Sequence, residues 1–142
     1  MKAFTLIEVL IGIGIVVILA AIGASVFKNL QPTLQLSGIT RELITDFRYA
    51  QQLTITKQIE HGVRFFSTEK KYQIIEYGAA EEVLKERVLP PEIGFSEINN
   101  FTGDEVKFNP YGAVKESGTI ILINTVSNVT TTIEIRPSGF VK

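Results

Sequence analysis

One acidic side chain, Glu8, interrupts an otherwise apolar run from Phe4 to Phe27. A helix of this length reaches roughly 36 Å, enough to cross a hydrocarbon layer about 30 Å thick. A carboxylate inside a bilayer costs about 2.5–3.5 kcal/mol on insertion scales, so an acid in such a segment predicts a function, namely pairing with a cation. The simpler alternative is that Glu8 only reaches the cytoplasmic headgroups.

The remaining chain offers few residues for catalysis. There is one histidine, His61, beside Gly62 at a predicted helix–strand junction, and we expect it at the surface. The absence of cysteine excludes disulfides, thiolate zinc sites and thiol nucleophiles. No glycine-rich phosphate-binding motif or histidine pair with metal-ligand spacing occurs. We therefore predict no catalytic residues, no metal, no cofactor and no enzymatic activity.

Oxygen-bearing side chains gather in one predicted loop, where they could suit Ca²⁺. These residues are Glu97, Asn99, Asn100, Asp104 and Glu105. Their spacing matches no calcium-binding loop, and polar loops are usually only solvated. The sequence leaves open whether residues 97–105 bind Ca²⁺.

Charge argues against nucleic acid as the main partner. Lys and Arg number 14 against 15 Asp and Glu, so no bulk positive charge is present. Neighbouring glutamates dilute the one local basic cluster, which consists of Lys70, Lys71, Lys85 and Arg87. Affinity for DNA rises with the number of phosphates neutralised, so this set predicts weak binding at most.

Apolar residues continue beyond the first run at helical spacing. Leu36, Ile39, Leu43, Phe47, Ala50 and Leu53 recur every three to four positions, and polar residues such as Asp46 fall mostly between them. We predict one long helix in two parts that ends near residues 56–58, with a kink or a new helix start at Pro32.

The pattern then changes to the period of two that is typical of strands. Candidate strands cover residues 62–66, 72–76, 83–89, 106–108, 119–123, 131–136 and 140–142, and residues 92–105 form a long loop. The predicted fold class is α+β, a long N-terminal α-helix packed on a mainly antiparallel β-sheet head.

The N-terminal residues Lys2-Ala3-Phe4-Thr5-Leu6-Ile7-Glu8 resemble the leader of type IV prepilins. The resemblance implies that prepilin peptidase cuts between Ala3 and Phe4, and that the new N-terminus at Phe4 is methylated. It also implies that Glu8 meets the N-terminal amine of a neighbouring subunit during filament assembly. The family usually has Gly where this chain has Ala3, so we expect slower cutting.

The head carries a second resemblance, in residues 108–112, 118–122 and 133–139 and in the helix segment 41–51. These segments are similar to the GspH/FimT group, the H-type pseudopilins of type II secretion and related minor pilins. The resemblance implies a pilin-like protein in four parts. These are the leader (residues 1–3), the transmembrane helix (4–27), its amphipathic continuation (28–57) and the β-rich head (58–142).

The function implied is that of a minor pseudopilin, a structural subunit of the type II secretion pseudopilus. The alternative is a minor type IV pilin with possible DNA binding through its head. Expected partners are prepilin peptidase, other pseudopilins or pilins, and inner-membrane lipid. The chain would cross the bacterial inner membrane once, with its N-terminus cytoplasmic and its head periplasmic or extracellular. A monomeric membrane-anchored binding domain is a further alternative.

Overall fold

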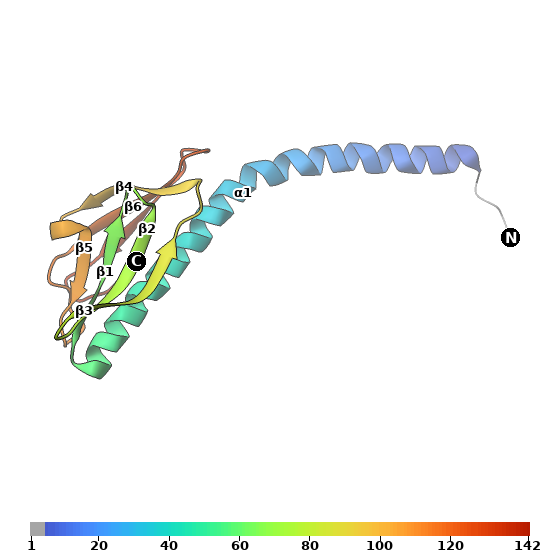
Figure 1. Ribbon diagram of the computed structural model, residues 1–142. Coiled ribbons are helices and arrows are strands. Elements are labelled where there is room, and N and C mark those ends of the chain that lie inside the picture. The colour runs from blue at the N-terminus through green and yellow to red at the C-terminus, as the bar shows by residue number, and fades with distance from the viewer. Residues whose placement is uncertain (1–4) are drawn as a thin grey trace.

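The computed structural model describes residues 5–142, without the side chains of residues 24–26, 28 and 29. One long helix extends from a β-rich head, and the N-terminal half of this helix projects away from every strand (Figure 1). The predicted leader, Ala3 and Phe4 lie outside the described residues.

Helix α1 (Leu6–Lys57) is continuous over 52 residues, or about 78 Å at 1.5 Å per residue. Thr5 caps its N-terminus, and Gln58 ends it in the left-handed conformation with φ 56°. Pro32 lies inside the helix, so the predicted new helix start is wrong. The helix bends between its blue and teal parts (Figure 1), and a proline, which lacks an N–H donor, permits such a bend.

The C-terminal half of α1 buries the predicted apolar stripe. Leu36, Leu43, Phe47 and Ala50 are almost inaccessible to solvent. Asp46, which the pattern assigns to the polar side, is an exception because its side chain is buried. The prediction of an amphipathic continuation is therefore confirmed, with one acid on the wrong face.

Two antiparallel sheets form the head, where the sequence suggested one. The four-stranded sheet has the order β3-β2-β1-β5, and the three-stranded sheet has the order β4-β6-β7. The first contains β1 (Glu60–Phe66), β2 (Lys71–Tyr77), β3 (Glu81–Val88) and β5 (Glu105–Phe108). The second contains β4 (Ile93–Asn99), β6 (Gly118–Asn124) and β7 (Thr130–Ile135), and a short 3₁₀ helix, η1 (Thr102–Asp104), precedes β5. The α+β class with antiparallel pairing is confirmed.

Strand β4 lies within residues 92–105, so the prediction that this whole segment is a loop is wrong. Six of its seven residues pair with β6, and a bulge lies between Phe95 and Glu97. A bulge inserts an extra residue, so side chains before and after it no longer alternate in one register. This irregularity hides the strand from a search for period two.

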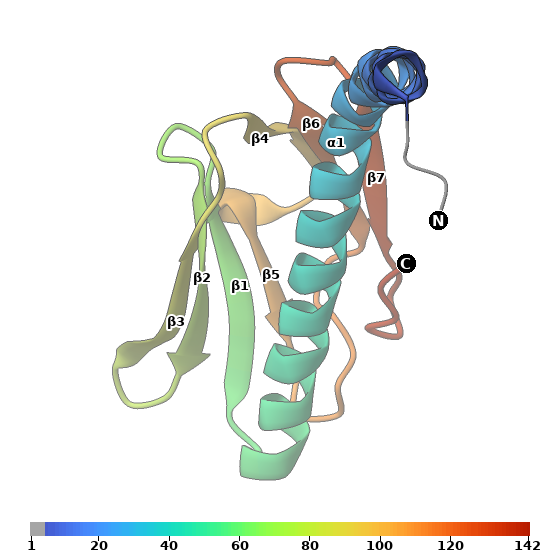
Figure 2. The ribbon, with the colours of Figure 1, turned by 90° about the vertical axis from the view of Figure 1, so that its right-hand side faces the viewer.

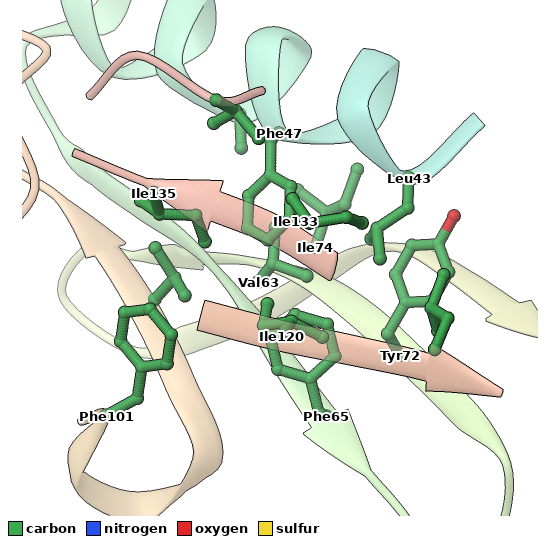
Figure 3. Close-up of a cluster of buried hydrophobic side chains, with 14 of the residues drawn as sticks. Leu43, Phe47, Val63, Phe65, Tyr72, Ile74, Phe101, Ile120, Ile133 and Ile135 are labelled. Carbon is green, nitrogen blue, oxygen red and sulfur yellow. The ribbon is translucent and has the colours of Figure 1, made fainter. Parts of the chain in front are cut away.

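The core lies between α1 and the two sheets (Figure 2). Leu43 and Phe47 point from the helix toward Ile74 of one sheet and Ile133 of the other (Figure 3). The chain ends beside β7, where Val141 forms a single bridge with Ile135 in place of the predicted last strand. One core thus joins the helix and both sheets.

Candidate functional site

The N-terminal part of α1 is apolar on every side. Residues Leu6–Gly23 make up the single helix segment, among the residues described, that is long and apolar enough to cross a membrane, and none of it is buried. Ile15, for example, is 54% exposed and Ile22 is 60% exposed. Exposed apolar patches of this extent mark contact with lipid or with protein.

Glu8 lies in the first turn of this segment. Its backbone N–H donates to the Thr5 carbonyl at 3.1 Å and approaches the Thr5 hydroxyl at 3.4 Å. Within residues 5–142, its carboxylate has no cationic partner. A negative charge at a helix N-terminus is favoured by the helix dipole, but that effect is small compared with the cost of a carboxylate in lipid. The geometry leaves the carboxylate open to a cation from outside residues 5–142.

Small residues along the segment leave its surface open. A Cβ atom added at Gly12, Gly14 or Gly23 would meet no neighbouring atom within 4 Å. Ala20 with Ala24, and Ala21 with Ser25, are pairs of small residues four positions apart in the sequence, and the side chains of residues 24 and 25 lie outside those described. Among the residues that the structure describes, none lies close to these glycine positions, so another helix could approach closely there.

Asp46 anchors the other half of α1 to the four-stranded sheet. Its carboxylate accepts a hydrogen bond from the Tyr72 hydroxyl at 2.8 Å and from the Lys85 ammonium at 2.5 Å. Burial, assisted by the hydrogen bond to Asp46, raises the pKa of Tyr72 well above its ordinary value. The phenol therefore stays protonated and keeps donating. A hydrogen-bonded charge pair of this kind fixes the helix against β2 and β3.

Further polar contacts hold α1 along its length. Glu42 pairs with Arg87 of β3, and Lys57 pairs with Glu76 of β2 at 2.5 Å. On the other side of the helix, the Gln51 amide donates to the Gly112 carbonyl at 2.6 Å. The helix is thus tied to strands and loops over its whole C-terminal half.

His61 is buried, so its predicted surface position is wrong. Its Nδ1 lies 2.8 Å from the Ile59 carbonyl and its Nε2 lies 3.0 Å from the Glu76 carboxylate. In β1, His61 lies on the same face of the strand as Val63 and Phe65, whose side chains face the core. Extending the two-residue alternation of the predicted strand back to His61 would have predicted that its side chain faces the core.

A charged cluster that the sequence did not indicate covers the outer face of the four-stranded sheet. The Glu105 carboxylate accepts hydrogen bonds from Arg64 at 3.0 Å and from the Tyr77 hydroxyl at 2.8 Å, and it pairs with Lys107 at 2.5 Å. Partial burial opposes ionisation of Glu105, but the hydrogen bonds from Lys107, Tyr77 and Arg64 prevail and lower its pKa. Each charge faces an opposite charge, so the cluster is structural in character.

The residues of the predicted calcium loop are divided among other elements. Glu97 and Asn99 lie in β4 and hydrogen-bond each other at 3.1 Å, whereas Glu105 belongs to the charged cluster in β5. In the described part of the chain, no group of three or more His, Cys, Asp or Glu side chains could hold a metal ion.

The predicted basic cluster is also divided. Lys70 donates to the Pro91 carbonyl at 2.6 Å, and Lys71 pairs with Glu69 at 2.6 Å. Lys85 and Arg87 face the helix acids Asp46 and Glu42. These contacts leave little positive charge directed at a phosphate backbone.

The fold is similar to that of solved minor pilins and pseudopilins. The minor pseudopilin EpsH from the type II secretion system of Vibrio cholerae matches with a TM-score of 0.65 and 9% identity, over 76% of this chain and 94% of that one. The type IV minor pilin FimU of Pseudomonas aeruginosa matches with a TM-score of 0.61 and 12% identity, over 78% and 88% of the two chains. The sequence matches no protein-family model and no curated protein. At these identities the likeness establishes the pilin-like fold of the GspH/FimT type.

Proposed function

We propose that this chain is a structural subunit of a pilus-like filament, and specifically a minor pseudopilin of a type II secretion pseudopilus. The observation that carries the proposal is the exposed apolar helix Leu6–Gly23 on a head with the fold of minor pilins and pseudopilins. A filament core of packed helices would cover that surface. No catalytic chemistry enters this function.

In this proposal, the newly made chain is first inserted into the bacterial inner membrane. The apolar part of α1 would span the bilayer, with the N-terminus cytoplasmic and the head on the opposite side. Prepilin peptidase would cut between Ala3 and Phe4, and the new N-terminus at Phe4 would be methylated. The leader-like sequence Lys2-Ala3-Phe4 supports this step.

Assembly would then place Glu8 opposite the amine of a neighbouring subunit. The carboxylate has no cationic partner within residues 5–142, and a free ammonium in lipid is as unfavourable as a free carboxylate. Pairing the two in a packed filament would compensate both charges. The partners are thus sister pseudopilins that form a hetero-oligomeric filament.

Mass spectrometry of the native protein tests the processing step. We expect a mature chain that begins with N-methyl-phenylalanine at Phe4. A native chain that retains its first three residues and co-purifies with no sister subunit would overturn the proposal, leaving a membrane-anchored domain.

Substitution of Glu8 tests the assembly step. Glu8→Ala should insert into the membrane normally but fail to enter filaments, measured by cross-linking to sister subunits. The matched control is Glu134→Ala, which removes an exposed carboxylate on the head and should assemble normally. Normal assembly of Glu8→Ala would favour a monomeric membrane-anchored binding domain.

A minor type IV pilin is the second candidate, because FimU shares the fold nearly as well as EpsH does. Deletion of the gene separates the two: loss of protein secretion favours the pseudopilin, and loss of surface pili favours the pilin.

A further inference from the structure

The turn between β6 and β7 lies at the end of the head where α1 emerges. The Thr125 N–H donates to the Glu92 carbonyl at 2.7 Å, and the Gln35 amide approaches the Glu92 carboxylate at 3.5 Å. Figures 1 and 2 both place the loop after β6 beside the part of α1 that leads toward the apolar segment. This turn is therefore on the side of the head that faces the proposed membrane.

A hydrogen-bonded scaffold holds the turn. The Asn124 side-chain oxygen accepts from the N–H groups of Val126 and Ser127 at 3.0 and 3.1 Å. The Asn124 carbonyl accepts from the Asn128 N–H at 2.8 Å, and Asn128 adopts the left-handed conformation with φ 56°. The backbone is thus fixed without any contribution from the Val126 side chain.

This scaffold displays apolar side chains to the outside. Val126 is 73% exposed and Val129 is 36% exposed. Solvent-facing turns usually carry Gly, Asn, Asp, Ser or Pro at such positions. Residues 125–129 contain no charged residue, so nothing within the turn opposes contact with an apolar phase.

The helix beside this end of the head is apolar as well. Phe27, Leu30 and Leu34 are 67%, 53% and 64% exposed and continue the apolar surface of Leu6–Gly23 toward the head. If the span ends near Phe27, Phe27 and Leu30 lie where a bilayer core gives way to its headgroups, a layer roughly 5–8 Å deep on each side, and Leu34 lies about 10 Å beyond Phe27 along the helix. Apolar surface from two different elements thus meets the same layer.

We propose that the Thr125–Val129 turn is a second membrane contact of the chain, which places Val126 among the lipid headgroups beside α1. The occupant is the outer surface of the bilayer, because the exposed valines are adjacent to a helix that is itself suited to lipid. The contact would hold the head against the membrane before the subunit joins a filament. The proposal rests on the membrane-spanning part of the proposed function but not on assembly.

Fluorescence quenching tests this contact directly, because the chain contains no tryptophan. The full chain is reconstituted at low density into phosphatidylcholine vesicles whose headgroups carry a nitroxide quencher. Val126→Trp and Val129→Trp each place a single indole in the turn. The matched control, Tyr111→Trp, replaces a side chain that is 91% exposed at the far end of the head, where Gln58 donates to the Pro110 carbonyl. Gln35 and Gln58 lie roughly 35 Å apart along the helix axis.

We expect quenching of the Val126→Trp variant to be at least twofold stronger than that of Tyr111→Trp, with Val129→Trp between the two. Equal quenching of Val126→Trp and Tyr111→Trp would overturn the proposal. A blue shift in the fluorescence emission of Val126→Trp that appears only as the protein-to-lipid ratio rises would overturn it too. Such a shift would mean that the turn contacts a second copy of the chain and not lipid. Failure of the chain to float with the vesicles would overturn the membrane anchor itself, and flotation without quenching would overturn only the second contact.

Discussion

Two carboxylates of one helix, Glu8 and Asp46, have opposite environments. Asp46 is buried and accepts hydrogen bonds from Tyr72 and Lys85. Glu8 lies in an apolar segment without a cationic partner in the described chain. A charge that is satisfied internally stabilises the fold, whereas Glu8 needs a cation from outside the described residues.

Substitution of Asp46 should destabilise the head. In Asp46→Asn, the amide cannot accept from both Tyr72 and Lys85, so we expect a loss of about 1–3 kcal/mol in the free energy of unfolding. Urea unfolding in mild detergent, followed by near-ultraviolet circular dichroism, measures it. The control is Glu134→Gln, which removes a surface ion pair with Arg136 and should change stability by less than about 0.5 kcal/mol. Equal effects of the two substitutions would contradict the anchoring role of Asp46.

Glu105 should make stability depend on pH in the acid range. Its pKa is lower in the folded head than the ordinary value of roughly 4.3, so its ionised form favours folding. The contribution is complete above the ordinary pKa and is lost as pH falls through the folded pKa. Thermal unfolding should therefore shift downward below about pH 4.3, and Glu105→Gln should weaken that shift. An unchanged pH profile in the variant would show that other acids dominate.

At the scale of elements, regular patterns were predictable and irregular ones were not. The helix, its apolar stripe and six of the strands were predicted from spacing and composition. In β2, the shift between Ile74 and Ile75 leaves the alternation before it intact. Strand β4 escaped because a bulge at Phe95 and Glu97 breaks its alternation. The division into two sheets also depends on which strands pair, and no local pattern encodes that.

The site prediction was limited because the sequence does not show which polar residues are buried in the core. Glu8 stands out because it is an acid in an apolar run, which can be seen from the sequence alone. The burial of Asp46 and His61 depends on partners distant in sequence, Lys85 and Glu76 among them. Pairings over such separations arise only when the elements pack.

Two glycine substitutions should have opposite signs. Gly38 lies in α1, where an added Cβ would meet nothing within 4 Å, so Gly38→Ala should stabilise the chain by roughly 0.5–1 kcal/mol. A Cβ at Gly62 would lie 2.5 Å from the Val106 carbonyl oxygen and 3.2 Å from the Tyr77 ring. Gly62→Ala should therefore destabilise by about 1–3 kcal/mol. Urea unfolding measures the free energy of unfolding of both variants. A stabilising Gly62→Ala would contradict the close approach of the backbones of β1 and β5.

For the whole molecule, the charge distribution argues against strong binding of DNA. The basic side chains of β2 and β3 face glutamates or the helix acids, as with Lys71 and Lys85. We expect no retardation of duplex DNA by the purified chain in a gel-shift experiment at low salt. Retardation that weakens steeply with added salt would instead support phosphate contacts and the DNA-binding alternative.

The long helix also determines how the molecule responds to mechanical force. A pull on the N-terminal end of α1 that straightens its bend is directed along the packed part of the helix, from Leu36 past Phe47 to the last turn at Lys57. The interface between helix and sheets is then sheared parallel to its length, and the Asp46 anchor, the apolar stripe and the ion pair of Lys57 resist together. Shear distributes tension over all these contacts at once, whereas a pull across the axis would open them one after another. A chain built in this way can bear tension on its helix while its head stays folded.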